Sequence, residues 1–467
     1  MGKYYLAVDI GASSGRHILG SIEDGKIVLE EIYRFENGMK KVDGHLCWDH
    51  KRLFENIKAG MKKAKEIGKI PVSMGIDTWG VDYALVDENG DLIDKMYGYR
   101  DSRTDGMDDE VYKIIPEKEL YARTGIQKAM FNTIYQCMAD KLQRPEVVEK
   151  AKALLFVPDY FNFMLTGTLA NEYTEATTGQ LISLETKDWD FELIEKLGYK
   201  KEIFQKVVTP GTSLGHLRPE VAEEVGYDLE LVVPCTHDTG SAVLAVPAND
   251  DDFIYISSGT WSLLGIERSI PDSSEVSYEN NFTNEGGYDY KFRYLRNIMG
   301  LWIIQSVRHN LDDKYGFAEI CSEAAKNKDF PSRIDVNDDC FMAPDNMIEA
   351  IKDYCRRTDQ PVPETLGEIA TVVYASLAEC YARTIKGIEE STGRTYSRIH
   401  VVGGGSNAGY LNELTAQATG KEVHAGPGEA TAIGNITAQM LKAGEFASKE
   451  EARDTIHKSF DIKIYNA

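Results

Sequence analysis

Two stretches in distant parts of the chain share one pattern, which limits the possible folds more than any other feature. In each, an apolar run leads into Ser-Ser-Gly, and a second run ending in Leu-Gly follows, at residues 13–20 and 257–265. Apolar runs joined at small turn residues predict a pair of strands with a tight connection. The second copy is one residue longer between its halves. We therefore expect an internal duplication that gives two related domains.

The segments around the two copies predict alternating strands and helices. Strands are expected at 4–10, 16–22, 26–35, 71–77, 398–402 and 421–425, and helices after Asp49, Leu366, Gly405 and Gly428. This alternation is typical of α/β domains. A polar break after the apolar run that ends near residue 246 places the domains at 1–244 and 245–467. The stretch 328–363 is rich in Asp, Asn and Pro, and we expect it to be irregular.

Charge and composition exclude several classes of function. A formal net charge of -23 repels nucleic acid and anionic lipid, and no Lys/Arg-rich run reverses this locally. We expect no nucleic-acid partner, and no membrane partner because no apolar run approaches spanning length. The seven cysteines are scattered without CxxC pairs, which argues against a disulfide framework or a zinc site. These features, with a start that lacks a signal-peptide core, predict a cytoplasmic protein.

The first Ser-Ser-Gly copy is a candidate phosphate-binding turn. Its small residues between two predicted strands allow backbone N–H groups to approach phosphate oxygens, and Arg16 adds positive charge. Asp9, at the end of the first strand, is placed to hold Mg²⁺ through water. The alternative for the same segment is a tight hairpin turn with a solvated Asp9.

Other nucleotide and hydrolase motifs fit less well. Residues 11–15 satisfy the G-x-S-x-G pattern of serine hydrolases, but a strand is expected after them where that motif requires a helix. A Walker A loop is excluded, because no Gly-Lys pair is followed by Ser or Thr. Three glycines at 403–405 either admit a nucleotide close to the backbone or form a plain turn, and their spacing is not that of a dinucleotide-binding loop.

Two further segments suit a sugar and its phosphorylation. His237, Asp238 and Thr239 follow an apolar run near the domain division, where a carboxylate can accept the proton of a hydroxyl during phosphoryl transfer. The alternative is a capped turn. Trp79 and Gly80 offer an aromatic face and close approach to the backbone, although Trp79 also fits a core position.

Taken together, these motifs resemble the FGGY family of carbohydrate kinases over nearly the whole chain. The family has the two-lobed actin-like, Hsp70-like ATPase fold, an α/β fold built from duplicated ribonuclease H-like domains. The resemblance rests on nine segments in order: VDIGASSGR (8–16), GIDTWGVD (75–82), YRDSRT (99–104), PDYF (158–161), HDT (237–239), SSGTWS (257–262), TNEGG (283–287), NIMGLW (297–302) and VVGGG (401–405).

The resemblance implies a site for each substrate. It implies that the first domain binds the sugar and the phosphates and that the second binds the nucleotide, with Asp238 as the catalytic base. The sugar would be bound by Gly80, His237, Asp238, Thr239 and Asn297. The ATP would be bound by Ala12, Ser13, Ser14, Gly15, Arg16, Thr260, Gln305 and Gly404.

The implied reaction converts L-rhamnulose and ATP to L-rhamnulose 1-phosphate and ADP in L-rhamnose catabolism, with Mg²⁺ required. Another ketose, such as L-fuculose or D-xylulose, remains an alternative substrate. A non-catalytic sugar-sensing or actin-like assembly protein of the same fold is a further alternative, which the presence of Asp9 and Asp238 disfavours. We expect a monomer or a small homo-oligomer, with the sugar and ATP as partners.

Overall fold

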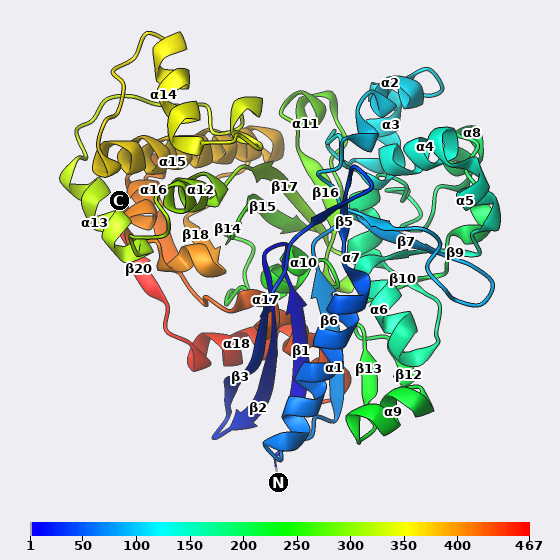
Figure 1. The fold of residues 1–467 in the computed structure, drawn as a ribbon. Coiled ribbons are helices and arrows are strands. Elements are labelled where there is room, and N and C mark those ends of the chain that lie inside the picture. Colours follow the sequence, from blue (N-terminus) through cyan, green and yellow to red (C-terminus); the bar gives the residue numbers. More distant parts are fainter. Residues whose placement is uncertain (1) are drawn as a thin grey trace. The chain divides into compact units, whose positions relative to one another are not determined.

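The structure, a computed structural model, describes residues 2–467 and divides into two compact units (Figure 1). The first unit contains the chain up to Ala245 together with Glu267–Tyr294 and Thr431–Ser459. The second contains Val246–Ile266, Leu295–Ala430 and Phe460–Ala467. Each unit is therefore assembled from three separate stretches of the chain.

A six-stranded sheet forms the centre of the first unit. Its order is β12 (Ser213–His216), β13 (Glu230–Val232), β6 (Ser73–Thr78), β1 (Tyr5–Ile10), β2 (Ser14–Glu23) and β3 (Lys26–Glu36). Strand β6 is parallel to β1 and β13, whereas β1, β2 and β3 form an antiparallel meander. The central strands β1 and β6 are buried along their whole length, as their continuous apolar runs predict.

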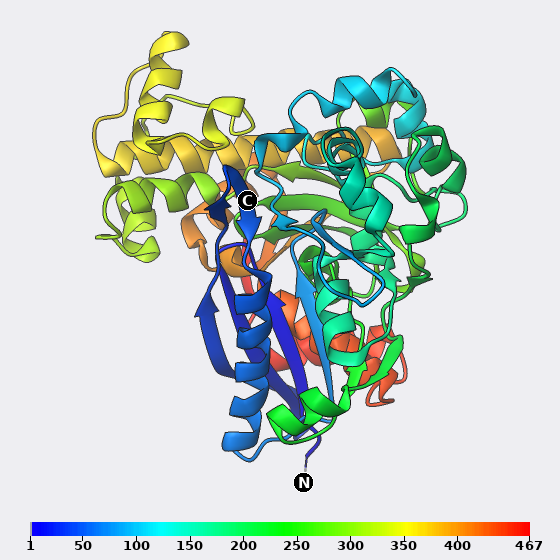
Figure 2. The same cartoon turned by 45° about the vertical axis from the view of Figure 1, so that its right-hand side comes forward.

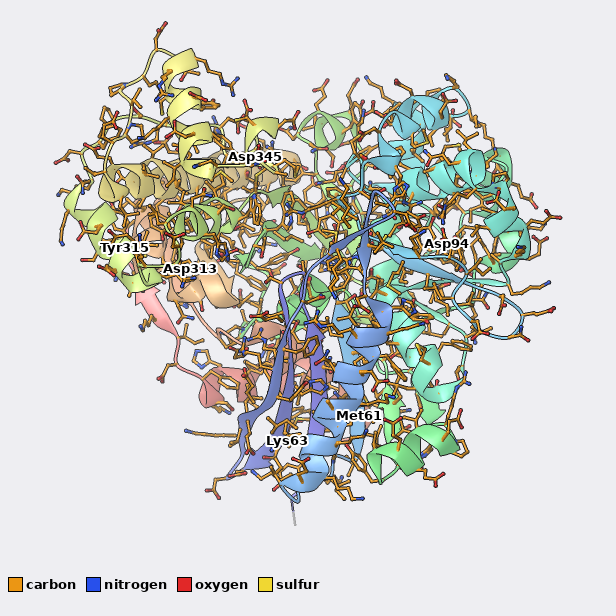
Figure 3. The ribbon with its side chains drawn as sticks, in the orientation of Figure 1. Met61, Lys63, Asp94, Asp313, Tyr315 and Asp345 are labelled. Carbon is orange, nitrogen blue, oxygen red and sulfur yellow. The ribbon has the colours of Figure 1, made fainter. Side chains whose placement is uncertain are left out.

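Helix α1 (His50–Glu66) covers one face of this sheet (Figure 2). The Asp49 side chain caps it by accepting a hydrogen bond from the Arg52 N–H, as the sequence predicts. Figure 3 marks two residues of α1 that are two positions apart. Met61 is fully buried, whereas Lys63 is about half-exposed and pairs with Glu66.

Helix α17 (Ala430–Lys442) returns to the first sheet near the end of the chain, its residues from Thr431 on belonging to the first unit. Gln439 donates to the Leu6 carbonyl and accepts from the Ser73 hydroxyl, so it holds β1 and β6 together. It also donates to the Asn435 side chain. The buried side-chain amides of Gln439 and Asn435 form hydrogen bonds with each other and with groups on β1 and β6. These hydrogen bonds fix the helix on the sheet.

The remaining elements of the first unit are short. The strands are β4 (Lys40–Val42), β5 (His45–Trp48), β7 (Tyr83–Val86), β8 (Met96–Tyr97), β9 (Ala153–Phe156), β10 (Asn171–Glu172) and β11 (Val207–Val208). The helices are α2 (Met107–Tyr112), α3 (Glu117–Thr124), α4 (Thr133–Gln143), α5 (Pro145–Lys150), α6 (Val157–Thr166), α7 (Tyr173–Ala176), α8 (Phe191–Lys196), α9 (Pro219–Val225), α10 (Asp238–Leu244), α11 (Glu275–Glu279) and α18 (Lys449–Ser459).

The strands of the second unit belong to a seven-stranded sheet, which also includes β16 and the first residues of β17 from the first unit. Its order is β16 (Thr283–Gly286), β17 (Phe292–Ile298), β15 (Ser262–Arg268), β14 (Phe253–Ser258), β18 (Arg398–Val402), β19 (Glu422–Ala425) and β20 (Lys463–Tyr465). The helices are α12 (Trp302–Asn310), α13 (Phe317–Lys326), α14 (Met347–Arg357), α15 (Leu366–Thr392) and α16 (Gly409–Thr419). The long helix α15 packs against α13 and α16.

The two Ser-Ser-Gly copies occupy equivalent places in the two sheets. The first forms the β1–β2 hairpin, whose first strand is parallel to β6, and the second forms the β14–β15 hairpin, whose first strand is parallel to β18. In each sheet, the hairpin's first strand pairs on its other side with a strand that follows a long helix. This shared topology confirms the duplicated α/β architecture expected from the sequence.

The stretch 328–363 differs from the expectation, because it contains helix α14. Asn346 caps this helix by accepting from the Glu349 N–H, and Met347, Ile351 and Cys355 are buried at a spacing of four residues. The surrounding Asp, Asn and Pro residues obscure this short apolar stripe in the sequence.

Within residues 2–467, none of the helices has the length and apolar character needed to cross a membrane.

Candidate active site

Three carboxylates from separate segments of the first unit come together at one edge of its sheet. Asp9 and Asp77 are paired residues on the parallel strands β1 and β6. Thr78, at the end of β6, forms a bridge with His237, which places the start of α10 beside the end of β6. The carboxyl ends of parallel strands are where α/β folds usually place their ligands. The segment containing His237 and Asp238 therefore lies in the expected position for a catalytic site.

Asp77 is the most deeply buried of the three carboxylates. The Asn435 side chain of α17 donates to its Oδ2 at 2.6 Å, while among residues 2–467 its Oδ1 has no hydrogen-bond partner. Burial, and then the nearby Asp9, raise the pKa of Asp77 well above the ordinary carboxyl value. The buried Asp77 therefore holds a proton more tightly than an ordinary carboxyl group does.

Arg16 lies opposite Asp9 in the β1–β2 hairpin, and its guanidinium donates to Asp9 Oδ2 at 2.8 Å. The turn between them is closed by a hydrogen bond from the Gly11 N–H to the Ser14 carbonyl at 2.9 Å. Ser14 then begins strand β2. A strand in this place rules out the nucleophile elbow of a serine hydrolase, because that motif needs a helix after its serine.

Gly15 has a packing role that the sequence does not reveal. A Cβ added there would lie 2.2 Å from Cζ of Phe35 on the neighbouring strand β3. The sequence favours small residues here for the approach of phosphate. The structure shows that the Phe35 ring alone already requires glycine at this position.

Asp238 is the first residue of α10, and its side chain is 34% exposed. Its Oδ1 accepts from the Thr239 N–H at 2.5 Å and from the Thr239 hydroxyl at 3.1 Å, and His237 Nε2 lies 3.6 Å away. Burial raises the pKa of Asp238 above the ordinary value, and Asp9 adds to this, while His237 and Thr239 oppose it. The group is a carboxylate of increased basicity with one side open, as a general base requires.

Glu172 supports this segment from behind, although no motif in the sequence points to it. The fully buried carboxylate accepts from the N–H groups of Thr174, Glu175 and Thr236 and from the hydroxyls of Thr174 and Thr236. It therefore joins the start of α7 to the residues that lead into α10. Because Asp238 follows Thr236 by two residues, Glu172 fixes the backbone from which Asp238 projects.

An aromatic cluster lies next to Gly80. The rings of Trp48 and Trp79 are 4.0 Å apart, and both indole N–H groups donate to the buried carboxylate of Asp82. Burial raises the pKa of Asp82 to about 6. Trp79 is almost fully buried and belongs to the core, whereas Gly80 is only partly buried and packs closely against Thr178. Of the two, Gly80 is the better placed to meet a ligand.

The candidate nucleotide residues of the second unit gather after β14. The Thr260 carbonyl accepts from the N–H of Trp302, the first residue of α12, the helix that also carries Gln305. Gly403 and Gly405 pack closely on Ser258, whereas a Cβ at Gly404 would meet nothing within 4 Å. Thr260, Gln305 and Gly404 thus come from three segments that lie around the end of β14.

Asn297 lies near the end of β17, also in the second unit. Its Oδ1 is buried and has no hydrogen-bond partner in the part of the chain that the structure describes. A buried carbonyl oxygen without a donor is costly, and a ligand hydroxyl would satisfy it.

The free space at Gly404 allows a direct test of nucleotide binding. Gly404→Val should raise the Kd for ATP by about tenfold, because the added methyl groups occupy space that a nucleotide would fill, without displacing any protein atom. Titration of each variant with ATP measures this change. The matched control is Gly316→Val in the same unit, where a Cβ also meets nothing within 4 Å. Equal ATP affinity in both variants would remove Gly404 from the site.

Comparison with known proteins extends these observations. The model of the N-terminal domain of the FGGY family of carbohydrate kinases matches residues 4–245, and that of the C-terminal domain matches residues 254–443. A rhamnulokinase of Halalkalibacterium halodurans is 52% identical, over 99% of this chain and 98% of the relative. A rhamnulokinase of Bacillus subtilis is 42% identical, over 99% of this chain and 95% of the relative.

Solved structures agree on the fold. A gluconate kinase from Lactobacillus acidophilus superimposes with a TM-score of 0.80 at 16% identity, covering 100% of this chain and 94% of that chain. A Plasmodium falciparum glycerol kinase with ADP gives a TM-score of 0.76 at 13% identity, covering 99% of this chain and 94% of that chain. The two-domain architecture predicted from the sequence is confirmed by these similarities.

Proposed function

Because the chain belongs to the FGGY family of carbohydrate kinases, we propose that it transfers the γ-phosphoryl group of ATP to L-rhamnulose. The product is L-rhamnulose 1-phosphate, and the reaction serves L-rhamnose catabolism. The names of the full-length relatives support this substrate. The observation that carries the proposal for catalysis is the partly exposed, basic carboxylate of Asp238 at the start of α10.

In this mechanism Asp238 is the general base. It accepts the proton of the primary hydroxyl at carbon 1 as that oxygen bonds to the γ-phosphorus and the bond to the leaving ADP oxygen breaks. His237 and Thr239 flank Asp238 and bind sugar oxygens, together with Gly80 and Asn297. The loose transition state of phosphoryl transfer mainly requires placement and charge stabilisation, which these fixed polar groups supply.

The phosphates of ATP are assigned to residues 12–16 and to Thr260, and the rest of the nucleotide to Gln305 and Gly404. Within residues 2–467, no three His, Cys, Asp or Glu side chains are placed to hold a metal ion together. This fits Mg²⁺, which usually binds one or two carboxylates and otherwise water and substrate phosphates. We assign Asp9 to that role, and the ion would neutralise charge on the transferring phosphoryl group.

The non-catalytic alternative has less support. A sugar sensor of this fold needs neither a base nor an acidic group beside the phosphate turn, yet Asp238 and Asp9 are both present and adjacent. The other ketoses are a closer alternative, because they would share the phosphate machinery. We further propose that the enzyme acts in the cytoplasm as a monomer or small homo-oligomer.

The substrate proposal is tested by comparing sugars. At fixed Mg·ATP, L-rhamnulose should show a kcat/KM at least about tenfold above L-fuculose, D-xylulose, L-ribulose and glycerol, because a misplaced hydroxyl leaves buried polar groups unpaired. Steady-state rates of ADP release measure the series. A kcat/KM for a different sugar about tenfold above that for L-rhamnulose, which is roughly 1.4 kcal/mol in transition-state binding, would overturn the choice of substrate. It would not overturn the kinase activity. No activity on any sugar would favour the sensor.

A further inference from the structure

A buried arginine lies directly behind the imidazole of His237. Arg293 on β17 has a side chain that is 0% exposed, and its Nη2 is 3.0 Å from His237 Nδ1. Its Nε donates to the Gly286 carbonyl at 2.7 Å. Glu285 Oε2 lies 3.1 Å from Nη2 and 3.4 Å from His237 Nδ1. All of these groups belong to the first unit.

The contact between Arg293 and His237 determines where the imidazole carries its proton. A guanidinium has only hydrogen-bond donors, so an atom 3.0 Å from Nη2 must offer a lone pair. A proton on Nδ1 would place two donors against each other inside the protein. A neutral imidazole with a bare Nδ1 carries its proton on Nε2. Nε2 is the atom that faces Asp238.

Glu285 makes this arrangement possible by holding the arginine. Although burial acts to raise it, the Arg293 guanidinium keeps the pKa of Glu285 below the ordinary value, so this carboxylate is ionised. The buried positive charge of Arg293 is thus compensated, and the Gly286 carbonyl fixes the orientation of the guanidinium.

We propose that Arg293, held by Glu285, is a positioning residue that locks His237 in its Nε2–H tautomer. The proposal rests on the proposed kinase function and deepens it in two ways. The sugar oxygen that meets His237 must accept a hydrogen bond. The imidazole has no lone pair on the substrate side, so the hydroxyl proton goes to Asp238 and not to His237.

Removing Arg293 should move the proton of His237 from Nε2 to Nδ1. Three charged groups face His237: Asp238 on α10, Glu285 on β16 and Arg293 on β17. Two further titratable groups interact with Arg293, the buried Tyr173 and Cys235. Burial raises the pKa of the last two, so they stay neutral. Without the Arg293 donor, Glu285 Oε2, which lies 3.4 Å from Nδ1, can accept a hydrogen bond from a proton-bearing Nδ1.

The test is nitrogen-resolved NMR of the full chain labelled with ¹⁵N-histidine, at pH 7.5. The His237 signals are identified by their loss in His237→Gln. The expected spectrum shows a proton on Nε2 and an unprotonated Nδ1. A proton on Nδ1, alone or on both nitrogens, would overturn the proposal. This result is independent of any sugar, so it separates failure of the tautomer from failure of the proposed function.

Variants then test the role of Arg293. Arg293→Met should move the proton of the imidazole to Nδ1 and lower kcat/KM by about tenfold or more. Arg293→Lys, which retains a donor and the charge, should restore the Nε2–H signal in part. Unchanged His237 signals in folded Arg293→Met would overturn the proposal. If that variant does not fold, the wild-type and lysine spectra still decide.

The matched control is Arg103→Met. It removes an equally buried arginine that is paired with Asp140 and has no contact with His237. It should lower stability while leaving the His237 signals unchanged. A shift of those signals in both variants would mean that they report general loosening of the fold, which would count against a specific role for Arg293.

Discussion

Asp238→Asn is expected to lower kcat by about 1,000-fold, because it removes the carboxylate to which we assign the hydroxyl proton. The fold should be preserved. Asparagine keeps an oxygen that can accept from the Thr239 N–H and hydroxyl, as Asp238 does. Single-turnover rates with L-rhamnulose and ATP, together with ATP titration and thermal melting, separate lost chemistry from lost binding or folding.

The pH dependence gives a second measurement on Asp238. Its pKa is raised, so the proton that blocks the base is lost only above the ordinary carboxyl range. The wild-type rate should therefore fall as pH decreases through that raised value, and the residual rate of Asp238→Asn should lack this limb. Asp228→Asn, a change at a half-exposed carboxylate, serves as the control and should match the wild type. A near-normal kcat in Asp238→Asn would contradict the assignment.

Glu172→Leu is expected to lower the free energy of unfolding by about 3 to 5 kcal/mol, because it leaves several buried donors without an acceptor. Thr174 and Thr236 each lose two hydrogen bonds, and the Glu175 N–H loses one. Denaturant unfolding at fixed temperature measures the change. Activity should also fall, because the backbone leading to Asp238 loses its support.

The control for this variant is Glu223→Leu at an exposed position. Its unfolding free energy should change by no more than about 0.5 kcal/mol. The loss of unfolding free energy in Glu172→Gln should lie between the losses in Glu172→Leu and Glu223→Leu. The Gln amide retains one acceptor oxygen but turns an N–H₂ group toward donors. Equal stability of Glu172→Leu and the wild type would show that the five hydrogen bonds do not hold this segment.

Local patterns allowed the fold to be predicted well. The apolar runs of β1, β2, β14 and β18 and the cap at Asp49 are encoded by neighbouring residues, and the structure confirms each of them. The segment 237–239 was also identifiable, because polar residues follow a buried strand. Its place beside Asp9 and Asp77 follows from parallel strand topology.

The groups behind the site could not be predicted, because their contacts join distant parts of the chain. Arg293 meets His237 across 56 residues, and Glu172 meets Thr236 across 64. Asn435 meets Asp77 across 358 residues. Neither the periodicity of apolar residues nor the spacing of motifs indicates such long-range contacts. Gly15 was predicted as a small residue for the approach of phosphate. The structure adds a steric reason that the sequence does not indicate, because the Phe35 ring of the neighbouring strand lies against it.

The return of α17 to the first sheet has a consequence for biosynthesis. Gln439 and Asn435 bind β1 and β6, which leave the ribosome long before the helix is made. Domains usually fold in order from the N-terminus during translation. Here the first unit must wait until residues 431–459 have been made, so the Leu6 carbonyl and the Asp77 side chain lack these protein partners until then. The nascent chain is therefore expected to depend on chaperones that shield this sheet during translation.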